Sequence, residues 1–415
     1  MNAAIITIGD ELISGGVIDT NSSFIARNLT LIGIETILCT SVGDDSSLIQ
    51  ETINNALKKS DLIIISGGIG PTGDDITRET ISEIVGKKLI VDPRIFESIQ
   101  AKLGKLGLKM AKSDKKQALF PEGARIVTNP VGIAGGFIVR FQKKPLIVLP
   151  GVPRELKSMM KESIIPFLLK EGGGDRIFKS RTLKVFGIAE TRVEESLQDI
   201  LREHTDLKVS FLPNYFENHI RITAAGKNEK EAESILAKVG GKIRQKMGRY
   251  FFGIDDQTLE SVTGDLLRSK NMTLAVAESC TGGLIAHCLT NVPGSSDYFK
   301  QGVVAYSNQT KIDLLGVPAD IIKTRGAVSE ETAGKMAEGV KKLGKTTLGL
   351  ATTGAAGPEG LEDSPVGKIF IAISGFKGTE VRDYNFSGSR ELIKLMTSHT
   401  ALYFLRNYLT GEDSS

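Results

Sequence analysis

The sequence has little cysteine and little histidine for its length. Among its 415 residues there are three cysteines (Cys39, Cys280 and Cys288) and four histidines. So few thiols exclude a fold held together by disulfide bridges, and they suit a reducing compartment. The small number of histidines matters for catalysis, because histidine is the most frequent general base beside a nucleophilic hydroxyl group.

Strong net charge and long apolar segments are also absent. Lys and Arg together number 52 and Asp and Glu 49, a net charge of +3, which excludes a dedicated nucleic-acid-binding protein and makes direct nucleic-acid binding an unexpected role. The longest apolar runs, such as LIIIS and PLIVLPG, have the length of strands rather than of membrane-spanning helices. The N-terminus begins a strand-like run without the basic region of an export signal. We therefore expect a soluble cytoplasmic protein that has no membrane partner.

What is present is an ordinary globular composition, with 40% hydrophobic and 24% charged residues. A chain of this length has room for two or three domains. The run EGGGD at 171–175 is the best candidate for a linker, and a second break falls near 252–257. The predicted domains span residues 1–170, 175–253 and 256–412.

The first domain alternates short β-branched runs with segments that have helical spacing. The predicted strands are Ala4–Ile8, Glu35–Thr40, Asp61–Ser66 and Leu146–Leu149. Because these runs are continuously apolar, they indicate a parallel α/β sheet covered on both faces. Ligands of such sheets bind beyond the carboxyl ends of the strands.

The other two domains have different patterns. Residues 181–253 read as strand, helix, two strands, helix and strand, which is typical of a small α+β module with a split βαβ plan. From Thr258 onward, helical and β-rich runs alternate again, so the C-terminal domain is predicted to be α/β.

A glycine-rich turn with acidic residues is the most informative motif of the first domain. The segment SGGIGPTGDDITRE at 66–79 could cradle an anion with its backbone N–H groups. Aspartates beside a phosphate repel it unless a divalent cation lies between them. The candidate ligands of such a cation are Asp10, Glu11, Asp44, Asp74 and Asp75. The alternative is that Asp75 and Thr77 simply cap a helix.

The segment AESCTGG at 277–283 is the informative motif of the last domain. It ends a predicted strand and opens a helix, so Ser279 lies where a nucleophile could point into a cleft. Backbone N–H groups of the following Thr-Gly-Gly turn could stabilise an oxyanion. Cys280 is a rival nucleophile, although a cysteine at a helix start more often packs.

A serine nucleophile needs a base, and histidine offers little here. His287 lies in the following helix with an apolar pattern and is expected to pack. A buried lysine can take the role of the base, and Lys311 and Tyr306 follow a strand-like run, GVVAY. A second glycine loop at 352–358 and the guanidinium of Arg390 could hold a phosphate or a carboxylate.

Taken together, these motifs resemble those of the CinA family of competence/damage-inducible proteins over essentially the whole chain. GDELISGGVIDTN, SGGIGPTGDDITRE and LPGVPRE are similar to the N-terminal domain of the family, which is related to the molybdopterin-binding MoaB/MogA fold. AESCTGG, YSNQTK, RGAVSE, TGAAGP and FSGSR are similar to its C-terminal domain. The middle module resembles the KH-type domain of the family.

The resemblance implies an activity for the C-terminal domain. In the family this domain is a nicotinamide-nucleotide amidase that converts nicotinamide mononucleotide to nicotinate mononucleotide and ammonia, with no cofactor. The resemblance implies that Ser279 is the nucleophile and Lys311 the general base, with Tyr306 assisting. The substrate-binding residues that it implies are Thr281, Gly282, Gly283, Thr353, Gly354 and Arg390.

The resemblance implies a second activity for the N-terminal domain. There the family has an ADP-ribose pyrophosphatase that yields AMP and ribose 5-phosphate and uses a divalent metal ion (Mg, Mn or Co), alone or with a monovalent cation. The metal ligands that the resemblance implies are the five acidic residues given above. The substrate-binding residues that it implies are Gly67, Gly68, Gly70, Thr72 and Thr77.

The chain departs from the family pattern in two places. The middle module has no GxxG loop between its first helix and second strand, so we expect it to join a homodimer rather than bind RNA. Gly135-Gly136 stands where the family often has proline–glycine, and a glycine in place of proline loosens that loop.

Two further hypotheses about the function of the chain are a nucleotide or molybdopterin sensor without turnover and a regulatory protein of competence or DNA repair.

Overall fold

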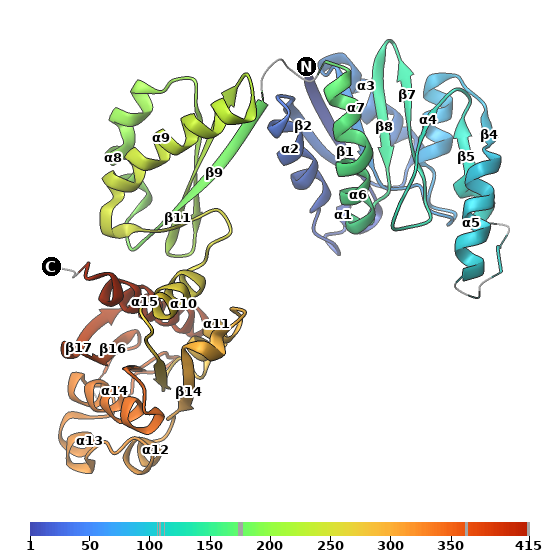
Figure 1. Cartoon of the computed structure of the whole chain (residues 1–415). Coiled ribbons are helices and arrows are strands. Elements are labelled where there is room, and N and C mark those ends of the chain that lie inside the picture. The colour runs from blue at the N-terminus through green and yellow to red at the C-terminus, as the bar shows by residue number, and fades with distance from the viewer. Residues whose placement is uncertain (106, 108, 112, 173–176, 362–363, 413–415) are drawn as a thin grey trace. The chain divides into compact units, whose positions relative to one another are not determined.

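The structure is a computed structural model that describes residues 1–105, 107, 109–111, 113–172, 177–361 and 364–412 (Figure 1). Residues 173–175 of the predicted linker lie outside the described residues. Within the described ranges, no helix is both long enough and apolar enough to cross a membrane.

The N-terminal domain is built on one mixed six-stranded sheet. Strands β2, β1, β3 and β8 are parallel, as the sequence predicts, whereas β7 and β6 extend the sheet in antiparallel fashion. In spatial order the strands are β2 (Glu35–Val42), β1 (Asn2–Ile8), β3 (Leu62–Ser66), β8 (Lys144–Leu149), β7 (Gly136–Phe141) and β6 (Arg125–Val127).

Both faces of this sheet are covered by helices, because successive side chains of each buried strand point to opposite faces. Ile5 and Ile64 pack with the core of α2, α6 and α7, while Ile6 and Ile65 pack with that of α3 and α4. Figure 1 shows these helices on the two sides of the sheet. The helices are α1 (Asp10–Ile13), α2 (Asn21–Leu31), α3 (Ser46–Lys59), α4 (Thr77–Val85), α6 (Pro153–Met159), a π-helical turn (Met160–Ile164) and α7 (Ile165–Lys170).

A small lobe is inserted between β3 and β6. It holds a two-stranded antiparallel sheet and a helix whose apolar face includes Ile99 and Leu103. Its elements are β4 (Leu89–Val91), α5 (Pro93–Lys105), a 3₁₀ turn (Ser113–Ala118) and β5 (Leu119–Pro121). The sequence analysis does not predict this lobe.

The middle module has the predicted order of strand, helix, two strands, helix and strand. Its sheet has the spatial order β10-β11-β9-β12. The elements are β9 (Ile177–Phe186), α8 (Glu190–Glu203), β10 (Lys208–Asn214), β11 (Glu217–Gly226), α9 (Glu229–Met247), a 3₁₀ turn (Gly248–Tyr250) and β12 (Phe251–Ile254). The prediction of a small α+β module is therefore confirmed.

The C-terminal domain has a five-stranded mixed sheet with β13 next to its centre. Strands β14, β13 and β15 are parallel, and β16 and β17 continue the sheet in antiparallel fashion. In spatial order they are β14 (Phe299–Val304), β13 (Leu274–Glu278), β15 (Leu348–Gly354), β16 (Lys368–Gly375) and β17 (Gly378–Asn385).

Helices cover both faces of this sheet too. Val276 and Leu350 pack with the core of α10, α11 and α15, and Ala277 and Ala351 pack with that of α14. The helices are α10 (Leu259–Ser269), α11 (Leu284–Thr290), a 3₁₀ turn (Ser295–Asp297), α12 (Asn308–Asp313), α13 (Ala319–Arg325), α14 (Glu330–Gly344) and α15 (Arg390–Thr410). This α/β architecture is the one that the sequence predicts.

Local signals explain where several of these helices begin. A side chain at the N-cap accepts a backbone N–H that the helix itself leaves unpaired. Asp45 does this for α3, Ser307 for α12, Ser329 for α14 and Ser389 for α15. The caps of α12 and α15 matter for function, because both helices carry residues of a pocket described below.

Candidate active sites

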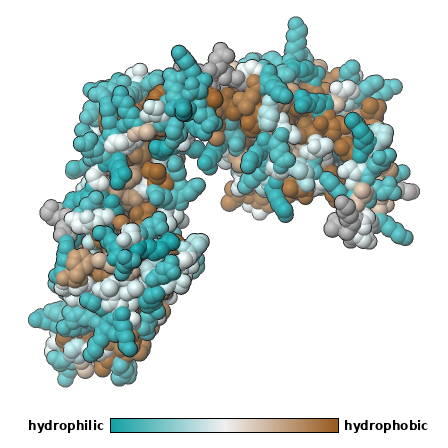
Figure 2. Space-filling view, in the orientation of Figure 1, coloured by the Kyte–Doolittle hydropathy of each residue, from teal (hydrophilic) through white to brown (hydrophobic). Residues whose placement is uncertain are grey.

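The glycine-rich turn of the N-terminal domain borders a hollow of about 590 Å³ at the carboxyl ends of β1, β3 and β8. Acidic residues line one part of it and exposed apolar side chains, Val17 and Val152, line its rim. Figure 2 shows apolar residues reaching the visible surface of this domain among hydrophilic ones. Of the predicted site residues, the lining includes Glu11, Asp44, Gly67, Gly68, Gly70, Asp74 and Asp75.

The turn itself is held by close backbone contacts. Gly67 has φ 115°, and a Cβ atom there would lie 2.1 Å from the carbonyl oxygen of Ile8, so only glycine fits. Thr77 is fully buried outside the lining; its Oγ1 donates to the Gly67 carbonyl (3.0 Å) and its N–H to the Gly68 carbonyl (3.1 Å). The structure thus places Thr77 as a residue that builds the turn.

Asp75 also bonds to the turn. Its carboxylate accepts the N–H of Gly70 (2.7 Å) and both the N–H (2.9 Å) and the hydroxyl (2.5 Å) of Thr72. Thr72 lies outside the lining of the hollow. A hydrogen bond from Thr72 also lowers the pKa of the neighbouring Asp74. Much of the acceptor capacity of Asp75 is therefore used within the loop.

Asp10 and Asp44 form a reciprocal pair. The carboxylate of each accepts the backbone N–H of the other at 3.0 Å, and Asp10 lies outside the lining of the hollow. Burial raises the pKa of Asp44, and the nearby negative charges of Asp10, Glu11 and Asp74 raise it further. The hollow thus has a negative electrostatic field around Asp44.

These carboxylates have the oxygen chemistry that a hard divalent cation prefers. However, within the described ranges no group of three or more His, Cys, Asp or Glu side chains is arranged to hold a metal ion. The contacts of Asp10, Asp44 and Asp75 with backbone N–H groups account for part of this. As placed, these carboxylates do not form a metal centre.

A buried arginine that the sequence analysis missed supports this site from behind. Arg78 is fully buried, and its guanidinium donates to the carbonyl groups of Ile69 (2.5 Å) and Gly135 (3.5 Å). Burial lowers the pKa of Arg78 to about 10. It thereby joins the glycine-rich turn to the loop with the Gly135-Gly136 departure. The buried residues of α4 other than Arg78 are mostly threonine and serine, so the helix pattern gave little signal that this arginine is buried.

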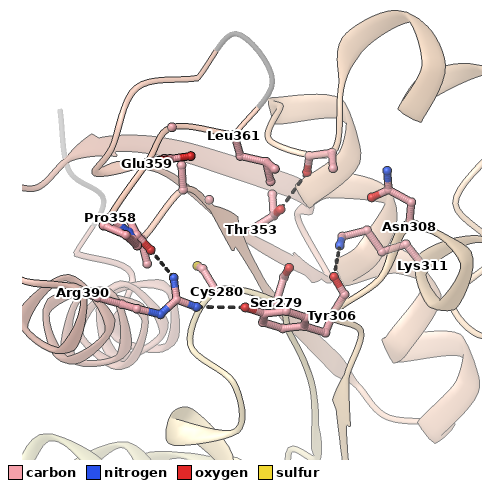
Figure 3. Close-up of a pocket in the computed structure, with 16 residues that line it drawn as sticks. Ser279, Cys280, Tyr306, Asn308, Lys311, Thr353, Pro358, Glu359, Leu361 and Arg390 are labelled. Atoms are coloured by element: carbon pink, nitrogen blue, oxygen red, sulfur yellow. Dashed lines mark hydrogen bonds between the residues drawn. The ribbon is translucent and has the colours of Figure 1, made fainter.

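The C-terminal domain has its own pocket, of about 510 Å³ (Figure 3). Six predicted site residues from separate parts of the sequence line it together. They are Ser279, Tyr306, Lys311, Thr353, Gly354 and Arg390.

Ser279 lies at the end of β13, where the chain turns sharply into α11. Gly282 and Gly283 have positive φ angles of 65° and 98°, which explains the glycines of this turn. The buried carboxylate of Glu278 accepts the N–H groups of Gly283 (3.0 Å), Ile285 (3.1 Å) and Ala286 (2.8 Å). The sequence analysis missed Glu278, although an acidic residue that ends an apolar strand could have pointed to it.

The remaining residues of the turn lie away from the pocket. Thr281 is fully buried, and its hydroxyl is hydrogen-bonded to that of Thr352 (2.9 Å). The N–H of Gly282 donates to the carbonyl of Ser279 (3.2 Å). Thr281, Gly282 and Gly283, predicted to bind substrate, are therefore outside the lining, and the amides of both glycines have partners within the chain.

Cys280, the rival nucleophile, lines the pocket but is poorly suited to reaction. Its thiol is buried, and burial raises its pKa to about 12. Because the thiolate is the reactive form, a thiol with this pKa is almost entirely protonated at neutral pH. The burial of this thiol therefore favours Ser279 as the candidate nucleophile.

Lys311 is buried on α12, and its Nζ donates to the backbone carbonyl of Tyr306 (3.4 Å). The Tyr306 ring is 63% exposed, and its hydroxyl accepts a hydrogen bond from Arg390 (2.9 Å). Figure 3 shows Lys311 and Ser279 facing the same space from different elements. The backbone carbonyl of Tyr306 thus contacts Lys311, and its phenol hydroxyl contacts Arg390.

The opposite wall is formed by the glycine loop after β15 and by α15. The guanidinium of Arg390 also donates to the Gly357 carbonyl, so it joins this loop to Tyr306 (Figure 3). The hydroxyl of Thr353 donates to the Ala327 carbonyl (2.7 Å). Asn308 and Glu359 also line the pocket, and the sequence analysis did not single them out.

Comparison with known families divides the chain into three matched regions. Residues 4–170 match the family described as probable molybdopterin binding domain. Residues 180–253 match the damage-inducible protein CinA KH domain, and residues 256–409 match the CinA C-terminal domain.

Relatives of the same length are similar throughout. A CinA-like protein of Syntrophus aciditrophicus is 43% identical over 414 residues, which is 99% of each chain. A CinA-like protein of Geotalea uraniireducens is 38% identical over 410 residues, 99% of this chain and 98% of the relative. Among solved structures, the CinA protein of Thermoplasma acidophilum is 36% identical and covers 40% of this chain and 99% of its own, with a TM-score of 0.37.

Proposed function

The chain belongs to the CinA family, and we propose that its C-terminal domain hydrolyses the carboxamide of nicotinamide mononucleotide to nicotinate mononucleotide and ammonia. Ser279 acts as the nucleophile and Lys311 as the general base. This reaction needs a nucleophile, a general base and a binding site for the phosphate of the substrate.

One observation carries this proposal. A serine on a tight strand-to-helix turn, a buried lysine and an arginine line one pocket, although they lie at 279, 311 and 390 in the sequence. A buried amine can lose its proton at neutral pH far more readily than an exposed one, which is what a serine–lysine mechanism requires.

The proposed reaction has two halves. Lys311 takes the hydroxyl proton as Ser279 Oγ attacks the carboxamide carbon, and the protonated lysine then gives that proton to the departing ammonia. This leaves an ester between Ser279 and the nicotinoyl group. Water attacks the ester with Lys311 again as the base, and the proton returns to Ser279 as nicotinate mononucleotide is released.

Binding of the nucleotide is assigned to the opposite wall. Arg390 has five N–H donors, and its hydrogen bonds to Gly357 and Tyr306 use two of them, so its guanidinium can also bind a phosphate. Thr353 and Gly354 border the space between Arg390 and Ser279, where the ribose would lie.

The test is ammonia release from nicotinamide mononucleotide, measured with and without a chelator. We expect release by the wild type in both conditions and none by Ser279→Ala. Ser295→Ala, in the 3₁₀ turn outside the pocket, is the matched control and should retain wild-type activity. Release by Ser279→Ala at the wild-type rate would refute the assignment.

For the N-terminal domain we propose hydrolysis of ADP-ribose to AMP and ribose 5-phosphate with a divalent metal ion. The hollow beside the glycine-rich turn, with Glu11, Asp44 and Asp74 on its wall, supports this proposal. Since the carboxylates do not converge as placed, binding of the metal requires them to move.

Two measurements test this second activity. AMP formation should depend on Mg, Mn or Co and be lost in Asp74→Asn, whereas the deamidation in the C-terminal domain should persist. Nucleotide binding without any AMP formation, under every metal condition, would instead favour a nucleotide or molybdopterin sensor.

A further inference from the structure

The carboxylate next to the proposed nucleophile accepts three backbone hydrogen bonds. Glu278 is 1% exposed and is the last residue of β13, and Ser279 follows it directly. Its Oε2 accepts the N–H groups of Gly283 and Ile285, and its Oε1 accepts that of Ala286. All three donors belong to the start of α11.

This arrangement replaces an ordinary helix cap. The first N–H groups of a helix lack partners within the helix, and a short polar side chain at the N-cap normally accepts one of them. Here the N-cap is Gly283, which has no side chain, and the acceptor comes instead from the strand before the turn. Glu278 therefore fastens β13 to α11 across the five residues that include Ser279.

We propose that Glu278 is a positioning residue for Ser279. Its carboxylate fixes both ends of the turn, and so holds the Ser279 hydroxyl toward the pocket that contains Lys311. The Ser279 N–H, bonded to the Thr352 carbonyl (3.0 Å), fixes the same turn from β15. This inference rests on the proposed amidase function, because it assigns Glu278 a role in presenting that nucleophile.

The same contacts change the expected source of the oxyanion donors. The N–H of Gly283 is bonded to Glu278, and that of Gly282 is bonded to the Ser279 carbonyl. Neither glycine of the turn therefore serves the oxyanion while Glu278 is in place. Glu278 contributes order to the site rather than contact with the substrate.

The variants distinguish the effect of the charge of the side chain at position 278 from the effects of its length and of a loss of folding. Glu278→Gln keeps the size of the side chain but has one carbonyl oxygen in place of two acceptors. Glu278→Asp keeps the charge and shortens the reach. Glu278→Ala leaves a space in which a small carboxylate could reach the same three N–H groups. Glu330→Gln, an exposed carboxylate in the first turn of α14, is the matched control.

We expect kcat for ammonia release to fall about 100-fold in Glu278→Gln and Glu278→Ala, with KM within about threefold, since the loss is one of nucleophile orientation. Glu278→Asp should recover part of kcat. Formate or acetate should restore kcat of Glu278→Ala in a saturable way, whereas chloride should not. Glu330→Gln should match the wild type.

The overturning results are equally specific. Wild-type kcat in both Glu278→Gln and Glu278→Ala would refute the role, and so would a loss of kcat that appears only together with a lost thermal unfolding transition. If Glu278→Ala does not fold, Glu278→Gln alone decides.

A second readout is independent of the substrate. The rate at which a sulfonyl fluoride labels Ser279 should fall in Glu278→Gln and not in Glu330→Gln. A wild type that releases no ammonia but shows this difference in labelling would refute the proposed function and leave the positioning role standing. Equal labelling rates would refute the positioning role.

Discussion

The two glycine-rich turns of the molecule illustrate different uses of acidic residues. Each turn follows a buried strand, and each borders a pocket. In the N-terminal domain, the carboxylates of Asp10, Asp44 and Asp75 face backbone N–H groups around the pocket and are partly used by them. In the C-terminal domain, the single carboxylate that holds the turn, Glu278, is buried, and other side chains line the pocket.

The difference teaches how much a local motif can say about chemistry. A tight turn needs acceptors for its N–H groups, so acidic residues close to it in sequence have a structural use whether or not they bind a ligand. Ser279, Lys311 and Arg390 share no such local need, because they come from three distant segments. Their convergence is therefore stronger evidence of a site.

The largest effect on activity should come from replacing Lys311, the proposed general base of the C-terminal pocket. Lys311→Arg should lower ammonia release from nicotinamide mononucleotide about 1,000-fold, because arginine stays protonated and cannot accept the serine proton. Lys335→Arg, an exposed residue paired with Glu338, is the control. An active Lys311→Arg enzyme would make Lys311 a structural residue, and the contrast between the two sites would disappear.

The next effect concerns stability of the N-terminal domain. Arg78→Ala should lower its free energy of unfolding by about 3 kcal/mol, because the carbonyl groups of Ile69 and Gly135 lose their donor and a cavity remains. Hydrogen exchange of residues 62–85 in the full chain measures this. Arg94→Ala, whose side chain is 85% exposed, should change exchange little. Equal protection in both variants would contradict the support assigned to Arg78.

A smaller effect tests the role of Tyr306. Tyr306→Phe removes the hydroxyl that accepts from Arg390 but leaves the carbonyl that Lys311 contacts. We therefore expect KM to rise about threefold and kcat to change less than twofold. If kcat instead falls about 100-fold, the phenol assists the chemical step, and the family resemblance implies that Tyr306 assists catalysis.

The smallest effect concerns the negative field of the N-terminal hollow. The pKa of Asp44 is raised in the folded state, so the folded chain binds this proton more tightly than the unfolded chain, and stability falls as the pH rises through that range. Asp44→Asn should therefore raise the unfolding temperature slightly at pH 7 and not at pH 3. Calorimetry measures this, and Asp206→Asn in the middle module serves as control. A lowered midpoint at pH 7 would contradict the assigned field.

Strands and layers were the most predictable part of the fold. Four predicted strands of the N-terminal domain and all elements of the middle module are present, because continuous apolar runs and helical spacing are local signals. The β7–β8 hairpin was missed because Gln142 and Lys143 adopt positive φ angles at its turn, where glycine or asparagine is the usual signal.

Which residues lie near each turn was easier to predict than whether their side chains face a pocket or bond within the chain. The sequence indicates that Thr77, Thr281 and Asp10 lie near the turns, but whether a hydroxyl or carboxylate faces a pocket depends on tertiary contacts. Glu278 and Arg78 were missed for the same reason. Buried charged residues are rare, so position in a motif gives little reason to expect them.

The fixed guanidinium of Arg390 has a consequence for turnover. Its bonds to Gly357 and Tyr306 hold it in place before any ligand arrives, so binding a phosphate costs little additional side-chain entropy. In the proposed reaction the phosphate is the same in substrate and product. An anchor that binds both equally adds affinity without lowering the chemical barrier. Arg390 should therefore slow departure of nicotinate mononucleotide as much as it favours arrival of the substrate, and product inhibition should weaken in parallel with substrate affinity when this arginine is replaced.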